Sequence, residues 1–155
     1  MAVVLADVLD EQNVTLELRA VTRDAAVREI VATMAGAAKV RQPHKYVEEV
    51  LAREKSHTTL LGHGVAFPHS RTELVDGIVL GIGRSAAGVP WGEQADPARL
   101  IFVIAVPRRM VTSYLVCVGA LARITKSEEN RAALMKAASA AELIEFLRAE
   151  SLLLA

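Results

Sequence analysis

The sequence predicts a single layered α/β domain, and three observations support this prediction. The chain has 155 residues, the size of one ordinary domain, and 52% of them are hydrophobic, which is enough for one substantial core. Short apolar runs of strand character alternate with apolar residues at helical spacing. The sequence shows no internal repeat, low-complexity stretch or linker. We therefore expect one domain over residues 1–155.

The first half of the chain predicts one strand followed by two helices. Apolar and polar residues alternate from Val14 to Leu18, as in a half-buried strand. The helix after it should end at Gly36, and a second helix should begin at Pro43 and end near Arg53. The apolar faces of these two helices consist of Val27, Ile30, Val31 and Met34, and of Tyr46, Val47, Val50 and Leu51.

The middle of the chain predicts two buried strands. The runs from Ile78 to Ile82 and from Leu100 to Val106 are rich in β-branched residues and are bounded by glycine or proline. Between them, the segment from Ala86 to Pro97 contains two glycines and two prolines, which predicts a loop or a short hairpin. Trp91 lies in this segment and is expected to pack there rather than to bind a ligand.

The last third of the chain predicts three helices. One begins near Thr112, and a second runs from Ser127 through Leu134. A third follows the S-x-x-E capping box that Ser139 and Glu142 form. The apolar tail from Leu152 to Leu154 should either pack against the domain or fray.

Charge and cysteine content exclude several classes of protein. Eighteen basic and eighteen acidic side chains cancel, so the chain lacks the electrostatic footprint of a nucleic-acid-binding protein. No apolar run approaches the roughly 20 residues of a membrane helix, and the first residues lack the basic region of a signal peptide. The one cysteine, Cys117, fits a reducing cytoplasm and is expected to be a small buried hydrophobe.

The segment from Arg53 to Arg71 concentrates the chemistry of the chain. It reads R-E-K-S-H-T-T-L-L-G-H-G-V-A-F-P-H-S-R and places His69 directly after Pro68. A neutral imidazole is nucleophilic near pH 7, and the planar guanidinium of arginine matches phosphate oxygens. His69 is therefore the candidate carrier of a phosphoryl group, with Arg53 and Arg71 as candidate phosphate clamps.

Other residues of the same segment fit a phosphoryl site, because phosphoryl transfer depends mainly on positioning and charge stabilisation. Gly62 and Gly64 let the chain turn or approach a group closely without a side-chain clash. Thr58 and Thr59 offer hydroxyl groups or nearby backbone donors. These four residues are therefore candidate supports of a phosphate site.

The histidines also permit two other interpretations. A single histidine is commonly a surface or hydrogen-bonded structural residue, and His44 at a helix start is expected to be one. His57, His63 and His69 fall at equal intervals of six, which suggests a metal site. An extended segment would hold neighbouring histidines about 20 Å apart. The sequence also has no H-x-x-x-H or C-x-x-C unit, so a metal site is disfavoured.

Three parts of this segment together resemble one active-site signature: R-E-K from Arg53, T-T at Thr58 and G-H-G-V-A-F-P-H ending at His69. It belongs to the enzyme IIA domains of the fructose, mannitol and nitrogen-related class in the bacterial phosphoenolpyruvate-dependent phosphotransferase system. The residues from Leu5 to Leu9 and the strand from Leu100 to Pro107 also occur in that family's order. The resemblance spans nearly the whole chain.

This resemblance implies a mixed β-sheet flanked by helices and a phosphotransferase component of the cytoplasm. It implies that His69 accepts a phosphoryl group from the histidine phosphocarrier protein and passes it to a cysteine of a IIB domain. Arg53 matches the family's phosphate-stabilising arginine. No cofactor, metal or membrane insertion is implied. The sugar is not identified, because selectivity belongs mainly to the membrane partner that the resemblance implies.

Two departures from the family's pattern bear on function. Tyr114 stands where family members often carry a second active-site histidine; a phenol can donate a hydrogen bond but lacks the imidazole's charge change near neutral pH. His63 stands where asparagine is common, and its side chain is a candidate donor toward the site. The alternative function is a regulatory module whose affinity for a target protein changes when His69 is phosphorylated. For the carrier function, Phe67 and Tyr114 are candidate rim contacts of the surface that docks partners, with a place in the core as the alternative for either residue.

Overall fold

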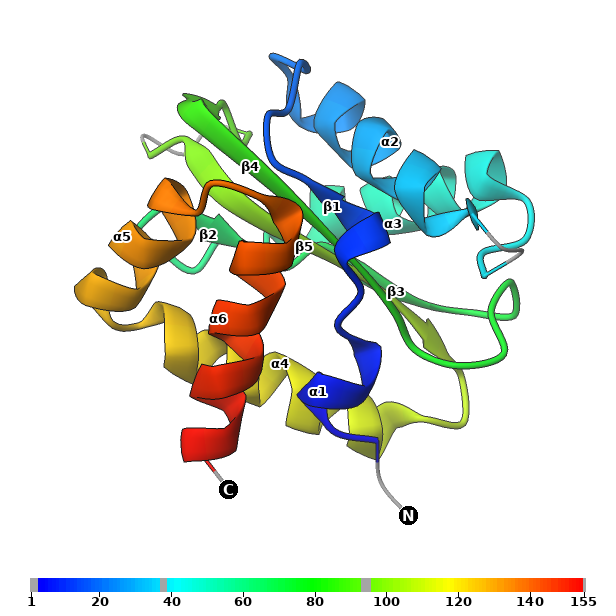
Figure 1. Cartoon of the computed structure of the whole chain (residues 1–155). Coiled ribbons are helices and arrows are strands. Elements are labelled where there is room, and N and C mark those ends of the chain that lie inside the picture. Colours follow the sequence, from blue (N-terminus) through cyan, green and yellow to red (C-terminus); the bar gives the residue numbers. More distant parts are fainter. Residues whose placement is uncertain (1–2, 37–38, 93–95, 155) are drawn as a thin grey trace.

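The computed structural model describes residues 3–36, 39–92 and 96–154. These residues form one five-stranded mixed sheet with helices on both faces, which confirms the predicted fold class (Figure 1). The strands are β1 (Val14–Thr15), β2 (Val65–Ala66), β3 (His69–Thr72), β4 (Val79–Val89) and β5 (Ala98–Pro107). The helices are α1 (Leu5–Val8), a 3-10 turn η1 (Glu11–Asn13), α2 (Arg23–Met34), α3 (Pro43–Ser56), α4 (Val111–Thr125), α5 (Glu128–Lys136) and α6 (Ala140–Leu153).

The long strands β4 and β5 form the centre of the sheet. They pair antiparallel, whereas β1 pairs with β4, and β2 and β3 pair with β5, in parallel. The two short strands β2 and β3 lie one after the other along the same edge of β5. In this register His69 lies opposite Ile104. His69 therefore begins an edge strand, next to helices that cover opposite faces of the sheet.

Each face of the sheet has its own hydrophobic core. The odd-numbered residues from Ile101 to Ala105 of β5 pack under α2 and α3. The even-numbered residues from Leu100 to Val106 pack against α1, α4, α5 and α6 on the other face. From Leu100 to Pro107, strand β5 is thus covered on both sides, which explains why this part of its sequence is apolar throughout instead of alternating.

Local capping signals fix where several helices begin. The side chains of Thr22, Ser127 and Ser139 each accept a hydrogen bond from the backbone N–H three residues further along, at 3.0 to 3.2 Å. The capping box predicted at Ser139 holds in its forward half only, because the carboxylate of Glu142 accepts a hydrogen bond from the N–H of Ala138.

The first strand is shorter than the predicted range from Val14 to Leu18. Only Val14 and Thr15 pair with β4. Beyond them, the side chain of Arg84 donates from Nε to the carbonyl of Leu16 at 3.0 Å, and Leu18 rejoins the backbone of β4 at 2.9 Å. At Leu16, a side-chain donor thus takes the place of the backbone donor that a continuing strand pair would supply.

Strand β4 is longer than predicted, so the expected loop from Ala86 to Pro97 begins only after Val89. The register shifts between Arg84 and Val89, and residues 93–95 of the expected loop lie outside the described residues. The strand runs through Gly81 and Gly83, where an added Cβ would lie 2.7 and 2.5 Å from side-chain atoms of α2. These glycines make room for the helix and do not end the strand.

Candidate functional site

His69 begins β3 at the edge of the sheet, between the C-terminal end of α3 and the first turns of α4. The carbonyl of Pro68 accepts a hydrogen bond from the N–H of Ile104 at 3.0 Å. The backbone that carries the imidazole is therefore held by the central strand β5. The side chain remains partly exposed.

The ring nitrogens of His69 have different partners. Nδ1 lies 2.9 Å from the carbonyl oxygen of Phe67. Because a carbonyl can only accept, Nδ1 carries the proton and Nε2 carries the lone pair. The prediction that Phe67 is a rim contact is wrong: its side chain is buried and stacks on Phe102, with ring centroids 5.4 Å apart. The core thus holds the carbonyl that selects the tautomer.

Two donors from opposite faces of the sheet converge on the unprotonated nitrogen. Nε of Arg53, from α3, lies 3.3 Å from Nε2 of His69, and the hydroxyl of Tyr114, from α4, lies 3.0 Å from the same atom. The rings of His69 and Tyr114 lie with centroids 4.8 Å apart. Both donors are aimed at Nε2 itself, so both would be neighbours of a group bound to this atom, and hydrogen bonds from such donors to charged phosphoryl oxygens are strong.

Burial and nearby charge keep the side chains of His69 and Tyr114 in their neutral forms. Burial lowers the pKa of His69, the hydrogen bond to the Phe67 carbonyl opposes this change, and the positive charge of Arg53 lowers the pKa further. Burial raises the pKa of Tyr114, so its hydroxyl stays a donor. At neutral pH the site therefore offers an uncharged, nucleophilic imidazole.

Helix α3 places Arg53 beside His69 because the buried face of the helix packs against β5. The hydroxyl of the buried Tyr46 donates to the carbonyl of Ile104 at 2.6 Å, at the level of His69 in the sheet. Arg53 follows seven residues later, about two turns along the same helix face. The helix continues to Ser56, one turn beyond its predicted end. The backbone N–H of His57, the residue after the helix, donates a hydrogen bond to the carbonyl of Arg53.

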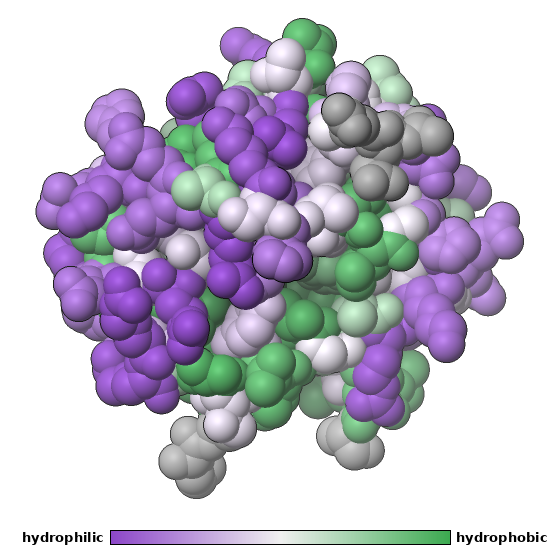
Figure 2. Space-filling view, turned by 180° about the vertical axis from the view of Figure 1, so that it is seen from behind, coloured by the Kyte–Doolittle hydropathy of each residue, from purple (hydrophilic) through white to green (hydrophobic). Residues whose placement is uncertain are grey.

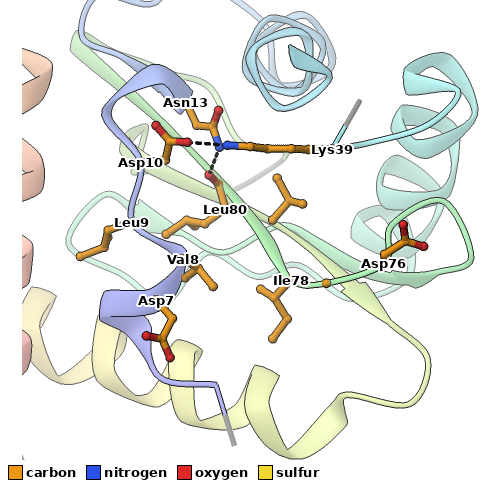
Figure 3. A pocket seen from close by; sticks show the side chains of 11 residues that line it. Asp7, Val8, Leu9, Asp10, Asn13, Lys39, Asp76, Ile78 and Leu80 are labelled. Atoms are coloured by element: carbon orange, nitrogen blue, oxygen red, sulfur yellow. Dashed lines mark hydrogen bonds and ion pairs between the residues drawn. The ribbon is translucent and has the colours of Figure 1, made fainter. Parts of the chain in front are cut away.

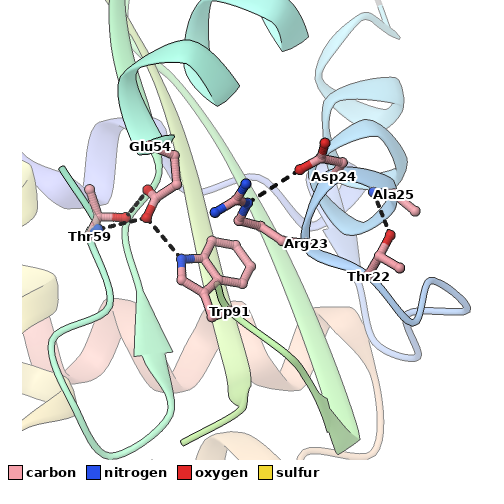
Figure 4. A network of polar contacts seen from close by, with 7 residues as sticks. All are labelled: Thr22, Arg23, Asp24, Ala25, Glu54, Thr59 and Trp91. Carbon is pink, nitrogen blue, oxygen red and sulfur yellow. Dashed lines mark hydrogen bonds and ion pairs between the residues drawn. The ribbon is translucent and has the colours of Figure 1, made fainter. Parts of the chain in front are cut away.

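A buried carboxylate next to Arg53 organises the following loop (Figure 4). Glu54 accepts hydrogen bonds from the N–H and the hydroxyl of Thr59 at 2.8 and 2.6 Å, and from Nε1 of Trp91 at 3.0 Å. It thereby ties the end of α3 to two loops. Glu54 is not among the site residues that the sequence pattern predicts. The available signal was its position three and four residues after Leu51 and Val50, on their buried helix face.

The glycine-containing turn returns the chain to the sheet. Gly62, His63 and Gly64 have φ values of 95°, 57° and 77°, which is the left-handed region. The carbonyl of Gly64 then accepts hydrogen bonds from the N–H groups of Arg99 and Leu100 at 2.7 and 3.0 Å. Gly64 thus lies in a tight turn, as predicted, and β2 begins directly after it.

Three predicted support residues have no hydrogen bond to His69 among the residues that the structure describes. The hydroxyl of Thr58 accepts a hydrogen bond from the N–H of Leu60 at 3.2 Å. The side chain of His63 is exposed and has no hydrogen bond to His69. Arg71 is exposed on β3, two residues beyond His69 and on the same face of the strand. Their proposed contacts with phosphate remain predictions.

The other candidate reactive groups lie in surroundings that favour a structural role. Among residues 3–36, 39–92 and 96–154, no three His, Cys, Asp or Glu side chains cluster as metal ligands would. Cys117 is buried, and burial raises the pKa of its thiol to about 11, so it is a poor nucleophile. Trp91 is buried, as expected. None of the helices described has the length and hydropathy needed to span a bilayer.

A pocket of about 360 Å³ lies between the N-terminal segment and the start of β4 (Figure 3). Its polar lining groups are engaged in the protein's own interactions. Asp10 pairs with Lys39, Asp76 pairs with Arg41 at 3.0 Å, and the amide of Asn13 donates to the protein backbone. The pocket residues include no histidine or cysteine. His69 therefore remains the candidate reactive centre.

Residues 7–150 match the family described as "Phosphoenolpyruvate-dependent sugar phosphotransferase system, EIIA 2". The chain belongs to this EIIA family. This EIIA chain is 27% identical over 144 residues to the fructose-specific EIIABC component of Bacillus subtilis. The match covers 92% of the EIIA chain and 23% of that relative, so the chain spans about a quarter of it.

Two solved structures share the EIIA fold over most of their length. The nitrogen regulatory protein IIA-Ntr from Neisseria meningitidis has 25% identity and a TM-score of 0.83, with 92% of this chain and 97% of that chain covered. The second is the complex of enzyme IIA-mannitol with phosphorylated enzyme IIB-mannitol from Escherichia coli. It has 27% identity and a TM-score of 0.77, with coverage of 91% and 97%. The resemblance inferred from the motif is confirmed.

Proposed function

We propose that this EIIA protein is a phosphohistidine carrier. Nε2 of His69 accepts a phosphoryl group from the histidine phosphocarrier protein and gives it to a cysteine of a IIB domain. The observation that carries this proposal is the convergence of Arg53 and Tyr114 on the unprotonated Nε2. The likeness to a IIA protein solved with its phosphorylated IIB partner supports the second step.

The proposed transfer is an in-line displacement at phosphorus. The lone pair of Nε2 forms the new N–P bond while the bond from phosphorus to the donor imidazole breaks, and the donor keeps that electron pair. Nδ1–H of His69 stays on the Phe67 carbonyl, and the donors of Arg53 and Tyr114 turn to the phosphoryl oxygens. In the onward step a cysteine thiolate attacks phosphorus, and the N–P electron pair returns to Nε2. The transfer requires no cofactor.

The test is intact mass after incubation with phosphoenolpyruvate, enzyme I and the histidine phosphocarrier protein. We expect one acid-labile phosphoryl adduct on the wild type and none on His69→Gln. Circular dichroism of the variant confirms that it is folded. Absence of the adduct under conditions that label a known IIA domain would reject the carrier function.

A regulatory function is the second candidate, favoured by the likeness to IIA-Ntr. In this function, phosphorylation of His69 places nearly two negative charges beside Arg53 and so changes the affinity for a target protein. The two candidates differ in the fate of the phosphoryl group. Rapid loss of the adduct to a IIB domain supports the carrier, whereas an adduct that persists with every IIB domain of the organism supports regulation.

A further inference from the structure

Glu54 is an acidic side chain in the interior of the protein. The side of the molecule seen in Figure 2 is largely covered by hydrophilic side chains, as expected where charged groups face water. Glu54, by contrast, is only 3% exposed. Its carboxylate accepts hydrogen bonds from the N–H and the hydroxyl of Thr59 and from Nε1 of Trp91. Burying such a group is costly unless it is hydrogen-bonded, so these three bonds hold Thr59 firmly against the end of α3.

Thr59 passes this constraint on to the segment that precedes His69. The carbonyl of Thr59 accepts a hydrogen bond from the N–H of Phe67 at 3.2 Å. Beside this bond, Leu60 and Ala66 form an antiparallel bridge, so the two sides of the loop run next to each other. Phe67 lies between β2 and β3, outside both strands. Its N–H therefore takes its partner from the loop that Glu54 holds.

The backbone of Phe67 continues the chain of contacts to the imidazole. Its carbonyl lies 2.9 Å from Nδ1 of His69. The hydrogen bond at one ring nitrogen of a histidine determines which nitrogen carries the proton. A continuous series of hydrogen bonds thus runs from Glu54 through Thr59 and Phe67 to His69. The proton on Nδ1 depends on how well this series keeps the Phe67 carbonyl in place.

We propose that Glu54 is a positioning residue that fixes the tautomer of His69. Through Thr59 it holds the carbonyl of Phe67, so the proton stays on Nδ1 and the lone pair stays on Nε2. The inference rests on the proposed carrier function, because this lone pair is the proposed nucleophile. Among the described residues, Glu54 makes no hydrogen bond to His69 itself. It acts only through the residues between them.

The test compares Glu54→Met with Glu54→Gln and with the control Glu48→Met, on the exposed face of the same helix. Methionine adapts to a buried site but is only a weak hydrogen-bond acceptor. Glutamine keeps an oxygen for the N–H of Thr59, and the Thr59 hydroxyl can turn to accept from its amide. ¹⁵N NMR of the imidazole gives the tautomer. Labelling by phosphoramidate, a small-molecule phosphoryl donor, measures the reactivity of Nε2.

We expect the wild type, Glu54→Gln and Glu48→Met to carry the proton on Nδ1. In Glu54→Met a fraction of the imidazoles should carry it on Nε2. Labelling of this variant should be on the order of three- to tenfold slower, the population change that the loss of one hydrogen bond allows. A purely structural role would lower the free energy of unfolding and leave the tautomer unchanged. A folded Glu54→Met protein with its proton still on Nδ1 would therefore overturn the inference.

A second variant covers the case in which Glu54→Met does not fold. Thr59→Val removes only the hydroxyl that donates to Glu54, in a half-buried loop residue. It should shift the tautomer in the same direction by a smaller amount, and an unchanged tautomer there would also overturn the inference. The wild type tests the carrier function separately. If neither phosphoramidate nor the histidine phosphocarrier protein labels it, that function fails, and the tautomer populations still decide the role of Glu54.

Discussion

The hydroxyl of Tyr114 lies 3.0 Å from Nε2 of His69, the ring nitrogen left without a proton by the bond from Nδ1 to the Phe67 carbonyl. A residue of α4 thus completes a site that begins on β3. By the resemblance to the family, Tyr114 stands where a second histidine is common. Because burial raises its pKa, the phenol remains a donor at neutral pH where an imidazole would titrate.

Replacing Tyr114 with phenylalanine tests this donor. Tyr114→Phe keeps the ring that packs near His69 and removes only the hydroxyl. We expect phosphoryl transfer to slow about tenfold, since one hydrogen bond to the transferring group is lost. Single-turnover transfer measures the rate, and Tyr114→His should add a pH dependence near neutrality. An unchanged rate in Tyr114→Phe would show that the hydroxyl does not contact the transferring group.

Arg53 is predicted to stabilise the charge of the transferring phosphoryl group. Arg53→Gln should lower the transfer rate by about 10²- to 10³-fold, the usual cost of removing one such donor. Arg53→Lys should fall between, because a point charge does not reproduce the planar guanidinium. The rates are compared for phosphoramidate and for the protein donor, with Arg28→Gln as control. A loss confined to the protein donor would place Arg53 in docking instead of chemistry.

The lowered pKa of His69 predicts how activity and stability depend on pH. In the folded state His69 protonates at a pH below its unfolded value of about 6.5. Its contribution to stability is therefore complete above the unfolded pKa and is lost as pH falls through the folded pKa. The transfer rate should hold until pH falls below about 6.5. NMR titration of the imidazole gives the folded pKa directly.

The same linkage gives a stability test. Between pH 7 and pH 5, urea unfolding should show a larger loss of stability for the wild type than for His69→Gln, which lacks the titrating group. Equal losses in the two proteins would mean that the imidazole has the same pKa in the folded and unfolded chain.

Two glycines with contrasting surroundings test the packing of the sheet. Gly83→Ala should destabilise the fold by about 1 to 3 kcal/mol, because the added Cβ would meet the side chain of Ile30 on α2. Gly119 lies in α4, where an added Cβ would have no atom within 4 Å apart from the adjoining backbone of its own helix, so Gly119→Ala should stabilise by about 0.5 to 1 kcal/mol. Urea unfolding measures both. A neutral Gly83→Ala would mean that α2 packs less closely on β4.

Much of the fold could be predicted from periodicity. Strand β5 is apolar from Leu100 onward because that part is buried on both faces, and α3 shows the apolar spacing of a helix with one covered face. The prediction failed where a distant group changed a local preference. Gly83 looked like a strand end but accommodates α2, and the first strand ends early where Arg84 takes the carbonyl of Leu16.

His69 could be predicted as the candidate reactive residue from the sequence alone, because His69, Pro68 and the glycine turn are neighbours along the chain and their chemistry is local. The surroundings of His69 depend on the tertiary structure. Arg53 and Tyr114 lie 16 and 45 positions away from His69 and meet it only when β3 pairs with β5 between α3 and α4. The same packing buries Phe67, since core contacts from β5 cover its ring. Burial and long-range contact depend on how the elements pack, and a one-dimensional pattern does not contain that information.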